Sequence, residues 1–508
     1  MLLYWLATAA IAMASVLLWT VIKQKATDRR RPTLDGGHWL WGHALFFAPI
    51  ETLHERLIAL ARRGPRAVWL RIGPAGPLGS DMVVLNDAAL ATAVLRMGAS
   101  RAEQDPDAVG DIARVIGRGL ISTRGDVWSK RRTVISSHFL SPPALRDYAP
   151  GMAADAARMA SALVAKTAQD NAAGSVSSHD MMLDWLMPYV LGVSLRLTCG
   201  DLPTDLDLRA FMHDLDTVFG EFNVRSFKPC NALRPTTAAH KAALARVRRI
   251  IGGVVAQTRR RLDNNASDDD DGDGGRPTLA AILLDKGADV YGTEDAVRDE
   301  TLLVTFGAYE TTAATAAYTL HLLAAHPDVQ ARVRDEVRAA TSLGTGGRVA
   351  AAAATPLLDA CVSESMRLYP AAFAVSRRAE VDLRIEAPAT ADDPDPCVVE
   401  VPAGTRILVN GVGISRAPRH WDDPDVFRPE RWLAGTDKCA RALCGSLPFG
   451  AGPRACPGSK LALLEIRTVI AALVDVVEFA PDPKRPFACA VRFMLRPDGP
   501  HLVCKPAA

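Results

Sequence analysis

The chain opens with one continuous apolar run, residues 2–22, which reads LLYWLATAAIAMASVLLWTVI and contains no charged side chain. As a helix rising ~1.5 Å per residue it would measure about 31 Å, roughly the thickness of a hydrocarbon core. Trp5 and Trp19 lie near its ends, where amphipathic rings favour the headgroup region, and a basic cluster at 23–31 follows. The pattern predicts a transmembrane anchor at 1–22. A cleaved signal peptide is the weaker interpretation, because the charged start is missing and the run is too long.

The remaining hydrophobic pattern predicts one mainly helical body. A basic, turn-rich linker at 23–45 leads to a first helix near 49–63, and strand-like runs follow at 67–72 and 82–85. Most of the sequence up to residue 340 has helical periodicity, so we expect little strand, placed towards the two ends of this body.

One polar stretch interrupts the helical pattern. Residues 264–275, NNASDDDDGDGG, combine like charges with glycines and are expected to form a mobile acidic surface loop. The segments on either side do not look self-sufficient. We therefore predict a single folded domain over 46–508.

The longest predicted helix begins at Thr293 and ends at Pro327. Thr293 is a favourable N-cap residue, and the acidic residues 294–295 suit the positive end of the helix dipole. A helix of roughly 33 residues would be about 50 Å long and would cross the whole domain. The polar residues 310–312 in its middle therefore need a functional or structural reason.

Composition narrows the class of protein. The 508 residues are 49% hydrophobic and 23% charged, which excludes global disorder. The balance of 59 Lys and Arg against 57 Asp and Glu argues against a nucleic-acid partner. Nine scattered cysteines without a Cys-x-x-Cys pair fit neither a disulfide framework nor a zinc ribbon, so we expect a reducing compartment.

One cysteine lies in a distinctive local sequence, FGAGPRACPG at 449–458. The early glycines permit unusual backbone angles, and an apolar helix starts directly afterwards, near Lys460. Cys456 is thus expected in a tight loop at a helix N-terminus, where backbone N–H groups and the helix dipole would stabilise a thiolate and lower the pKa. The other eight cysteines are expected to be small buried residues.

This loop resembles the haem-binding loop Phe-x-x-Gly-x-Arg-x-Cys-x-Gly of the cytochrome P450 haem-thiolate monooxygenases. Phe449, Gly452, Arg454, Cys456 and Gly458 fill all of its fixed positions. The resemblance implies a haem b cofactor whose iron has Cys456 as its axial ligand. It also implies that Phe449 packs against the porphyrin and that Arg454 pairs with a haem propionate.

Three further residues resemble family positions that contact the haem propionates. Trp128 and Arg132 in WSKRR share a helix face in the family's Trp-x-x-x-Arg arrangement. Arg377 in VSRRAEVD occupies the place of one more propionate partner, although the adjacent Arg378 leaves the register open.

Two other segments resemble a structural network of the family. Glu364 and Arg367 in ESMR lie three residues apart, on one helix face, and FRPERW at 427–432 supplies Arg431. The resemblance implies a buried Glu364, Arg367 and Arg431 triad that supports the core behind the cysteine loop.

The mid-helix sequence GAYETT at 307–312 resembles the family's oxygen-activation motif, with Ala308 in place of the usual second glycine. The resemblance implies that the Thr311 hydroxyl donates to bound dioxygen and that Glu310 connects it to bulk protons. The alternative is an internal polar patch whose hydroxyls are satisfied by i−4 carbonyls.

The resemblance implies the mainly α haem-domain fold with a small β region, preceded by one transmembrane helix. The function it implies is insertion of one oxygen atom into a largely apolar small molecule, in secondary-metabolite or lipid metabolism. Electrons would come from a separate NADPH-cytochrome reductase, with cytochrome b5 as a second candidate donor. The protein would be single-pass in the endoplasmic reticulum membrane, with its catalytic domain facing the cytosol.

Two other functions stay open at this point. One is a haem-thiolate isomerase or dehydratase that acts on a hydroperoxide, although such enzymes often lose the acid and alcohol that Glu310 and Thr311 provide. The other is a non-catalytic, membrane-tethered haem sensor, which would not need that pair.

For docking of the proposed reductase, the candidate basic contacts are Lys130, Arg131, Lys438, Arg441 and Lys460.

Overall fold

The computed structural model describes residues 32–38, 40–73, 79–200, 203, 206–226, 235–264, 276–342, 355–389, 396–433 and 445–507. The predicted anchor at 1–22, the linker as far as residue 31 and the acidic segment beyond Asn264 lie outside these residues. Among the described helices, none combines the length and the apolar character needed to cross a bilayer.

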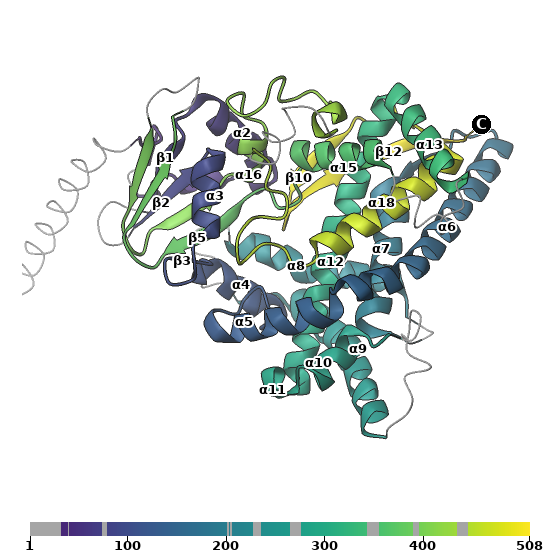
Figure 1. Ribbon diagram of the computed structural model, residues 1–508, viewed down its shortest axis with the longest axis horizontal. Helices are drawn as coiled ribbons and strands as arrows, with labels where there is room; N and C mark the ends of the chain where they lie inside the picture. Colours follow the sequence, from purple (N-terminus) through teal and green to yellow (C-terminus); the bar gives the residue numbers. More distant parts are fainter. Residues whose placement is uncertain are drawn as a thin grey trace, which may run out of the picture.

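Helices make up most of the described chain, which confirms the predicted mainly α class (Figure 1). The larger ones are α2 (Leu53–Arg63), α3 (Ala88–Arg96), α4 (Pro106–Ile116), α5 (Gly125–Val134), α6 (Pro142–Ala172), α7 (Met187–Cys199), α8 (Leu208–Ser226), α9 (Ala238–Asp263), α10 (Leu279–Asp285), α12 (Glu294–Ala325), α13 (Pro327–Ser342), α15 (Pro356–Leu368) and α18 (Ser459–Val476). Shorter ones are η1 (Ala44–Phe47), η2 (Ile50–Thr52), η3 (Ile135–Phe139), η4 (Met181–Leu186), α11 (Ala288–Tyr291), α16 (Gly411–Ser415) and η8 (Pro429–Trp432).

The main sheet lies at one side of the molecule, with α2, α3 and α16 near it (Figure 1). Its strand order is β1 (Ala67–Ile72), β2 (Ser80–Leu85), β8 (Arg406–Val409), β5 (Val375–Ala379) and β3 (Ala102–Glu103). Only the β2 and β8 pair within this sheet is parallel. The sheet therefore joins the N-terminal strands to a segment more than 300 residues later.

Three small sheets complete the β region. They are β6 (Leu383–Ala387) with β7 (Cys397–Val401), β10 (Ala488–Val491) with β11 (Leu495–Asp498), and β12 (His501–Pro506) between β4 (Ser178–Asp180) and β9 (Val477–Pro481). The predicted runs at 67–72 and 82–85 are confirmed as β1 and most of β2. The strands lie towards the two ends, as predicted, at 67–103 and 375–506, except for β4, which lies between helices.

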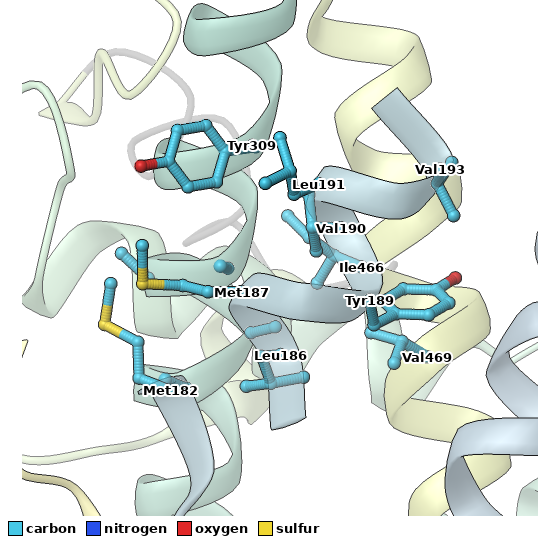
Figure 2. Packing of buried hydrophobic residues seen from close by; sticks show 14 of the residues in the cluster. Met182, Leu186, Met187, Tyr189, Val190, Leu191, Val193, Tyr309, Ile466 and Val469 are labelled. Atoms are coloured by element: carbon cyan, nitrogen blue, oxygen red, sulfur yellow. The ribbon is translucent and has the colours of Figure 1, made fainter. Parts of the chain in front are cut away.

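The long helix α12 runs through the middle of the molecule (Figure 1). Its start is as predicted, because the Thr293 hydroxyl accepts a hydrogen bond from the Ala296 amide at 3.2 Å. Figure 2 shows Tyr309 of α12 beside Leu191 of α7, with Ile466 of α18 close behind. All three side chains are buried. This packing fixes the rotation of α12 and therefore the direction in which its central polar residues face.

Candidate active site

The loop before α18 has the conformation that its glycines allow. The amide of Cys456 donates to the Phe449 carbonyl at 2.9 Å, which closes the loop. Gly450 and Gly452 have φ angles of 69° and 70°, which side chains other than glycine rarely adopt. A Cβ atom on Gly452 would also collide with the Leu95 carbonyl of α3. The loop is therefore held against α3 by a contact that only glycine permits.

Opposing effects act on the pKa of the Cys456 thiol. The residue keeps an exposed face, yet the protein atoms around the sulfur reduce its solvation and raise the pKa of Cys456 above its ordinary value. The Gly458 amide and the charge of Arg132 act in the opposite direction. The predicted lowering of this pKa is therefore wrong for the free thiol, because desolvation outweighs the backbone and charge contributions.

Arg454 is held beside this loop by three contacts. Its guanidinium pairs with Glu103 at 2.9 Å, donates to the Thr123 carbonyl at 3.0 Å and lies 4.0 Å over the Trp128 ring. Its Nη1 atom is buried and has no hydrogen-bond partner among the residues that the structure describes. The structure thus brings the predicted residues Arg454 and Trp128 together and leaves one donor of Arg454 to be satisfied.

Two more of the predicted arginines lie in this region. Arg132 donates to the carbonyl of Ala455 at 2.7 Å, next to Cys456. Arg377 is buried and donates to its neighbouring Ser376 carbonyl at 2.9 Å. Burial and the nearby charge of Arg454 lower the pKa of Arg377 to about 10.

The register left open by the sequence is decided by strand β5. Arg378 points to the other face of the strand and pairs with Asp105 at 2.9 Å and Asp107 at 2.7 Å. Arg377 therefore faces Arg454, and Arg378 belongs to a separate surface network.

This arginine cluster can be tested as a haem site. Arg132, Arg377 and Arg454 carry three positive charges, and Glu103 supplies one negative charge to Arg454. The cluster therefore has an excess of about two positive charges, with the side chains of Arg377 and Arg454 buried and that of Arg132 partly buried, and buried cations require anionic partners. Haem b carries two propionate groups, so the charge excess and the unsatisfied Arg454 donor fit this cofactor.

The centre of α12 presents a narrow accessible face. Gly307 is exposed and Ala308 and Thr311 are partly accessible, although most of the helix is buried. The Thr311 hydroxyl donates to the Gly307 carbonyl at 2.8 Å. This is the i−4 bond expected of an internal polar patch, and it leaves the hydroxyl oxygen free to accept another hydrogen bond.

Glu310 faces away from this strip and is buried. Its Oε1 atom lies 3.6 Å from Nη1 of Arg496 on β11, and the same nitrogen lies 3.3 Å from Oδ1 of Asp216 on α8. Burial raises the pKa of Glu310 to about 7, while Arg496 opposes the rise and Asp216 adds to it. Sequence reasoning missed Arg496 and Asp216, since nothing in the local sequence links positions so far apart.

The predicted structural triad is confirmed. Glu364 accepts from Nη2 of Arg367 at 2.7 Å and from Nε of Arg431 at 3.0 Å, and all three side chains are buried. Trp432 adds an indole donor at 2.8 Å. The network ties α15 to η8.

The candidate reductase contacts differ in their exposure to solvent. Lys130 and Lys460 are exposed, as a docking role requires, while Lys438 and Arg441 lie outside the described residues. The prediction is wrong for Arg131, which is buried and pairs with Glu300 at 3.2 Å.

The family model and the relatives described below are all cytochromes P450, and the family model covers most of the chain. The family model described as Cytochrome P450 matches residues 32–504. The maize protein Cytochrome P450 78A1 is 32% identical over 384 residues, which are 73% of this chain and 67% of the maize protein. Human Cytochrome P450 4F12 is 25% identical over 491 residues, 93% of this chain and 89% of the human protein. Mouse Cytochrome P450 3A13 is 28% identical over 206 residues, 40% of this chain and 39% of the mouse protein.

Proposed function

Because this chain belongs to the cytochrome P450 family, we propose that it is a haem-thiolate monooxygenase acting on a largely apolar small molecule. The observation that carries the proposal is the cluster of Arg132, Arg377 and Arg454 beside the Cys456 loop, whose excess charge fits the propionates of haem b. The other support is the acid and alcohol at the centre of α12.

In this proposal the residues of the site divide between the iron, the porphyrin and the propionates. Cys456 holds the iron through its sulfur, and binding to a metal ion favours the thiolate over the thiol. Phe449 packs against the porphyrin, and Arg454, Arg377, Arg132 and Trp128 hold the propionate edge. When bound, the haem supplies the iron at which dioxygen is activated.

Thr311 and Glu310 supply the proton path. With a pKa raised to about 7, Glu310 can both hold and release a proton near neutral pH. When the Thr311 hydroxyl gives up its hydrogen bond to the Gly307 carbonyl, it can release its own proton towards the accessible face of the helix while it accepts another at Oγ1. The two residues are adjacent in the sequence but face different sides of α12, so the path between them requires bridging water.

The apolar substrate class is proposed from the apolar side chains that pack near the centre of α12. Phe219, Phe306 and Phe493 form an aromatic group on the Glu310 side of α12, and Phe373, two residues before β5, is also buried. Apolar surroundings of this kind favour apolar compounds. We assign electron supply to a separate NADPH-cytochrome reductase, with cytochrome b5 as a second donor and exposed Lys130 and Lys460 among the basic contacts.

The location in the endoplasmic reticulum membrane is likewise a proposal, supported by the apolar run 2–22 and the basic cluster 23–31. Deletion of residues 1–31 should release a haem protein that is extracted by alkaline carbonate, whereas the full chain stays with the membrane. A deleted protein that resists extraction as well as the full chain does would place the main membrane contact in the folded domain.

The first test of function is the iron ligand. The reduced carbon-monoxide complex of the full chain should show the absorption band specific to a thiolate ligand, and Cys456→Ser should lose it. Cys489→Ser, at a cysteine outside the loop, is the matched control and should keep the band. A Cys456→Ser protein with an unchanged band would remove this residue from the iron site.

The second test is the coupling of NADPH use to product. After a panel of apolar compounds is screened for a spin-state change, Thr311→Ala should lower the ratio of product to NADPH consumed and raise the yield of peroxide. Thr341→Ala is the control, because Thr341 makes the same i−4 bond, to Val337 at 2.8 Å, but lies on α13. Turnover of a hydroperoxide without NADPH would instead favour an isomerase.

A further inference from the structure

Three elements meet beside Glu310, and each supplies one aromatic ring and one charged side chain. The elements are α8, α12 and the hairpin of β10 and β11. Their rings belong to Phe219, Phe306 and Phe493, and their charges to Asp216, Glu310 and Arg496. The Phe493 ring packs edge-on against Phe306 at 5.4 Å and Phe219 at 5.5 Å. The ring and the charge on each element are only three or four residues apart, so any movement of α8 alters both contacts.

The charged contacts are not equivalent. A single nitrogen, Nη1 of Arg496, lies 3.3 Å from Asp216 and 3.6 Å from Glu310. The side chains of Arg496 and Glu310 are 8% and 4% exposed, whereas that of Asp216 is 39% exposed. The two carboxylates therefore share one buried nitrogen, and the more exposed of them can exchange its contact for water.

The hairpin that carries Arg496 is fixed by its backbone. The amide of Leu495, the preceding residue, donates to the Ala371 carbonyl at 2.9 Å, and the Arg492 amide donates to the Met494 carbonyl at 2.9 Å. Packing against α7 and α18 also fixes α12. Of the three charged side chains, only that of Asp216 is more than one third exposed.

We propose that Arg496 is a positioning residue for the monooxygenase reaction: it holds the Glu310 carboxylate in its buried position on α12, and Asp216 on α8 controls how strongly it does so. The inference rests on the proposed function for its catalytic meaning, because only a proton-carrying Glu310 gives this contact a role in turnover. The contact between Arg496 and Glu310 itself rests on the structure alone.

The charges around Glu310 make the proposal directional. Arg496 and, more weakly, Arg492 favour the ionised form of Glu310, whereas Asp216 disfavours it. Tyr309, the remaining titratable neighbour, stays neutral, because burial and the adjacent Glu310 raise its pKa well above the ordinary value. Loss of Arg496 should therefore raise the pKa of Glu310 above about 7, and loss of the Asp216 charge should lower it.

The experiment uses the haem-loaded full chain and compares Arg496→Gln, Arg496→Lys and Asp216→Asn. Infrared difference spectroscopy follows the protonated carboxyl group of Glu310 as a function of pH, and Glu310→Gln identifies its band. Arg496→Gln should raise the midpoint by about one pH unit or more, Asp216→Asn should lower it by roughly half a unit, and Arg496→Lys should restore most of the wild-type value. Arg492→Gln is the control and should move the midpoint least.

The same variants are then compared in the pH profile of product formed per NADPH. This profile should move in the direction of each infrared midpoint, which a merely structural role for Arg496 would not produce. Shifts in the same direction for Arg496→Gln and Asp216→Asn, or no infrared shift in either, would overturn the proposal. Should Arg496→Gln fail to bind haem, Asp216→Asn decides by itself, because a midpoint that is unmoved or raised contradicts it.

The two readouts also separate this proposal from the proposed function. The infrared titration requires no turnover, so it tests the contact even in a protein that oxidises nothing. Opposite infrared shifts without any NADPH-dependent product would reject the monooxygenase assignment and the catalytic role of Arg496, while leaving its contact with Glu310 established. NADPH-dependent product whose pH profile ignores both substitutions would reject the positioning role alone.

Discussion

Glu364 lies at the centre of a buried network with Arg367 and Arg431. Replacing Glu364 by glutamine should destabilise the domain more than any other single change of a hydrogen-bonding side chain in that network. Glu364 is the only carboxylate bonded to Arg367 and Arg431 among the described residues, and it also accepts from Trp432. The amide would present an NH₂ group to donors and leave two buried guanidinium groups without an anion. Breaking a buried ion pair by removing one partner costs about 3–5 kcal/mol.

That loss is large compared with the total stability of a domain, which is about 5–15 kcal/mol. The control is Glu386→Gln, because Glu386 pairs with Arg384 at the equally short distance of 2.7 Å but on the surface. Exposed pairs contribute little, so the control should unfold as the wild type does. The measurement is urea unfolding at fixed protein and haem concentration, followed by tryptophan fluorescence, with haem content as a second readout.

The pH dependence sharpens this test. Burial opposes ionisation of Glu364, but the hydrogen bonds and charge of Arg367, with Trp432 and the Arg428 amide, outweigh it and hold the pKa of Glu364 below its ordinary value. A lowered folded-state pKa means that the stabilisation is present above the unfolded pKa near 4.5 and is lost as pH falls through the folded value. The difference between wild type and Glu364→Gln should thus be constant from about pH 6 to 8 and shrink in acid. Equal urea midpoints for Glu364→Gln and Glu386→Gln at pH 7 would refute the reasoning.

Two further predictions concern the cysteine loop and α18. Gly452→Ala should lower the haem content, because the new Cβ atom meets the Leu95 carbonyl and the φ of 70° is strained; Gly98→Ala, which meets nothing within 4 Å, should not change the haem-to-protein absorbance ratio. Glu465→Gln should stabilise the protein in alkali, since burial raises the pKa of Glu465 from 4.5 to about 8 and ionisation therefore opposes folding increasingly between these values. The gain, roughly 1.4 kcal/mol for each pH unit between 4.5 and 8, should appear in unfolding at pH 9 and be absent at pH 4; equal gains at both would contradict it.

The sequence predicted those parts of the fold that depend on interactions between residues close together in the chain. The apolar spacing and the Thr293 cap predicted α12 almost to the residue, and the strand pattern at 67–72 predicted β1. The cysteine loop was identifiable because its backbone conformation requires particular glycines at fixed positions. These features depend on residues that are neighbours in the sequence, so a single sequence contains the information needed to recognise them.

Contacts between distant segments carried no such signal. Glu103 lies far in sequence from its partner Arg454, as Asp216 does from Arg496, and any of many carboxylates would have suited each arginine equally well. The pairing depends on where the folded chain brings β3, α8 and the β10–β11 hairpin. The sequence therefore pointed to Glu310 and Arg454 but not to the charges that set their properties.

Pairs of adjacent arginines show why side-chain direction is the limiting information. Arg131 and Arg132 are one residue apart on α5, yet a helix turns about 100° per residue, and one is buried against Glu300 while the other reaches the Ala455 carbonyl. Arg377 and Arg378 alternate across strand β5, so only one of them can face Arg454. In each pair the residue types are identical, and the difference in role comes from the phase of the element against the core. Phase is set by the packing of the whole domain, which is why the same basic motif supplies both a buried structural arginine and a candidate haem contact.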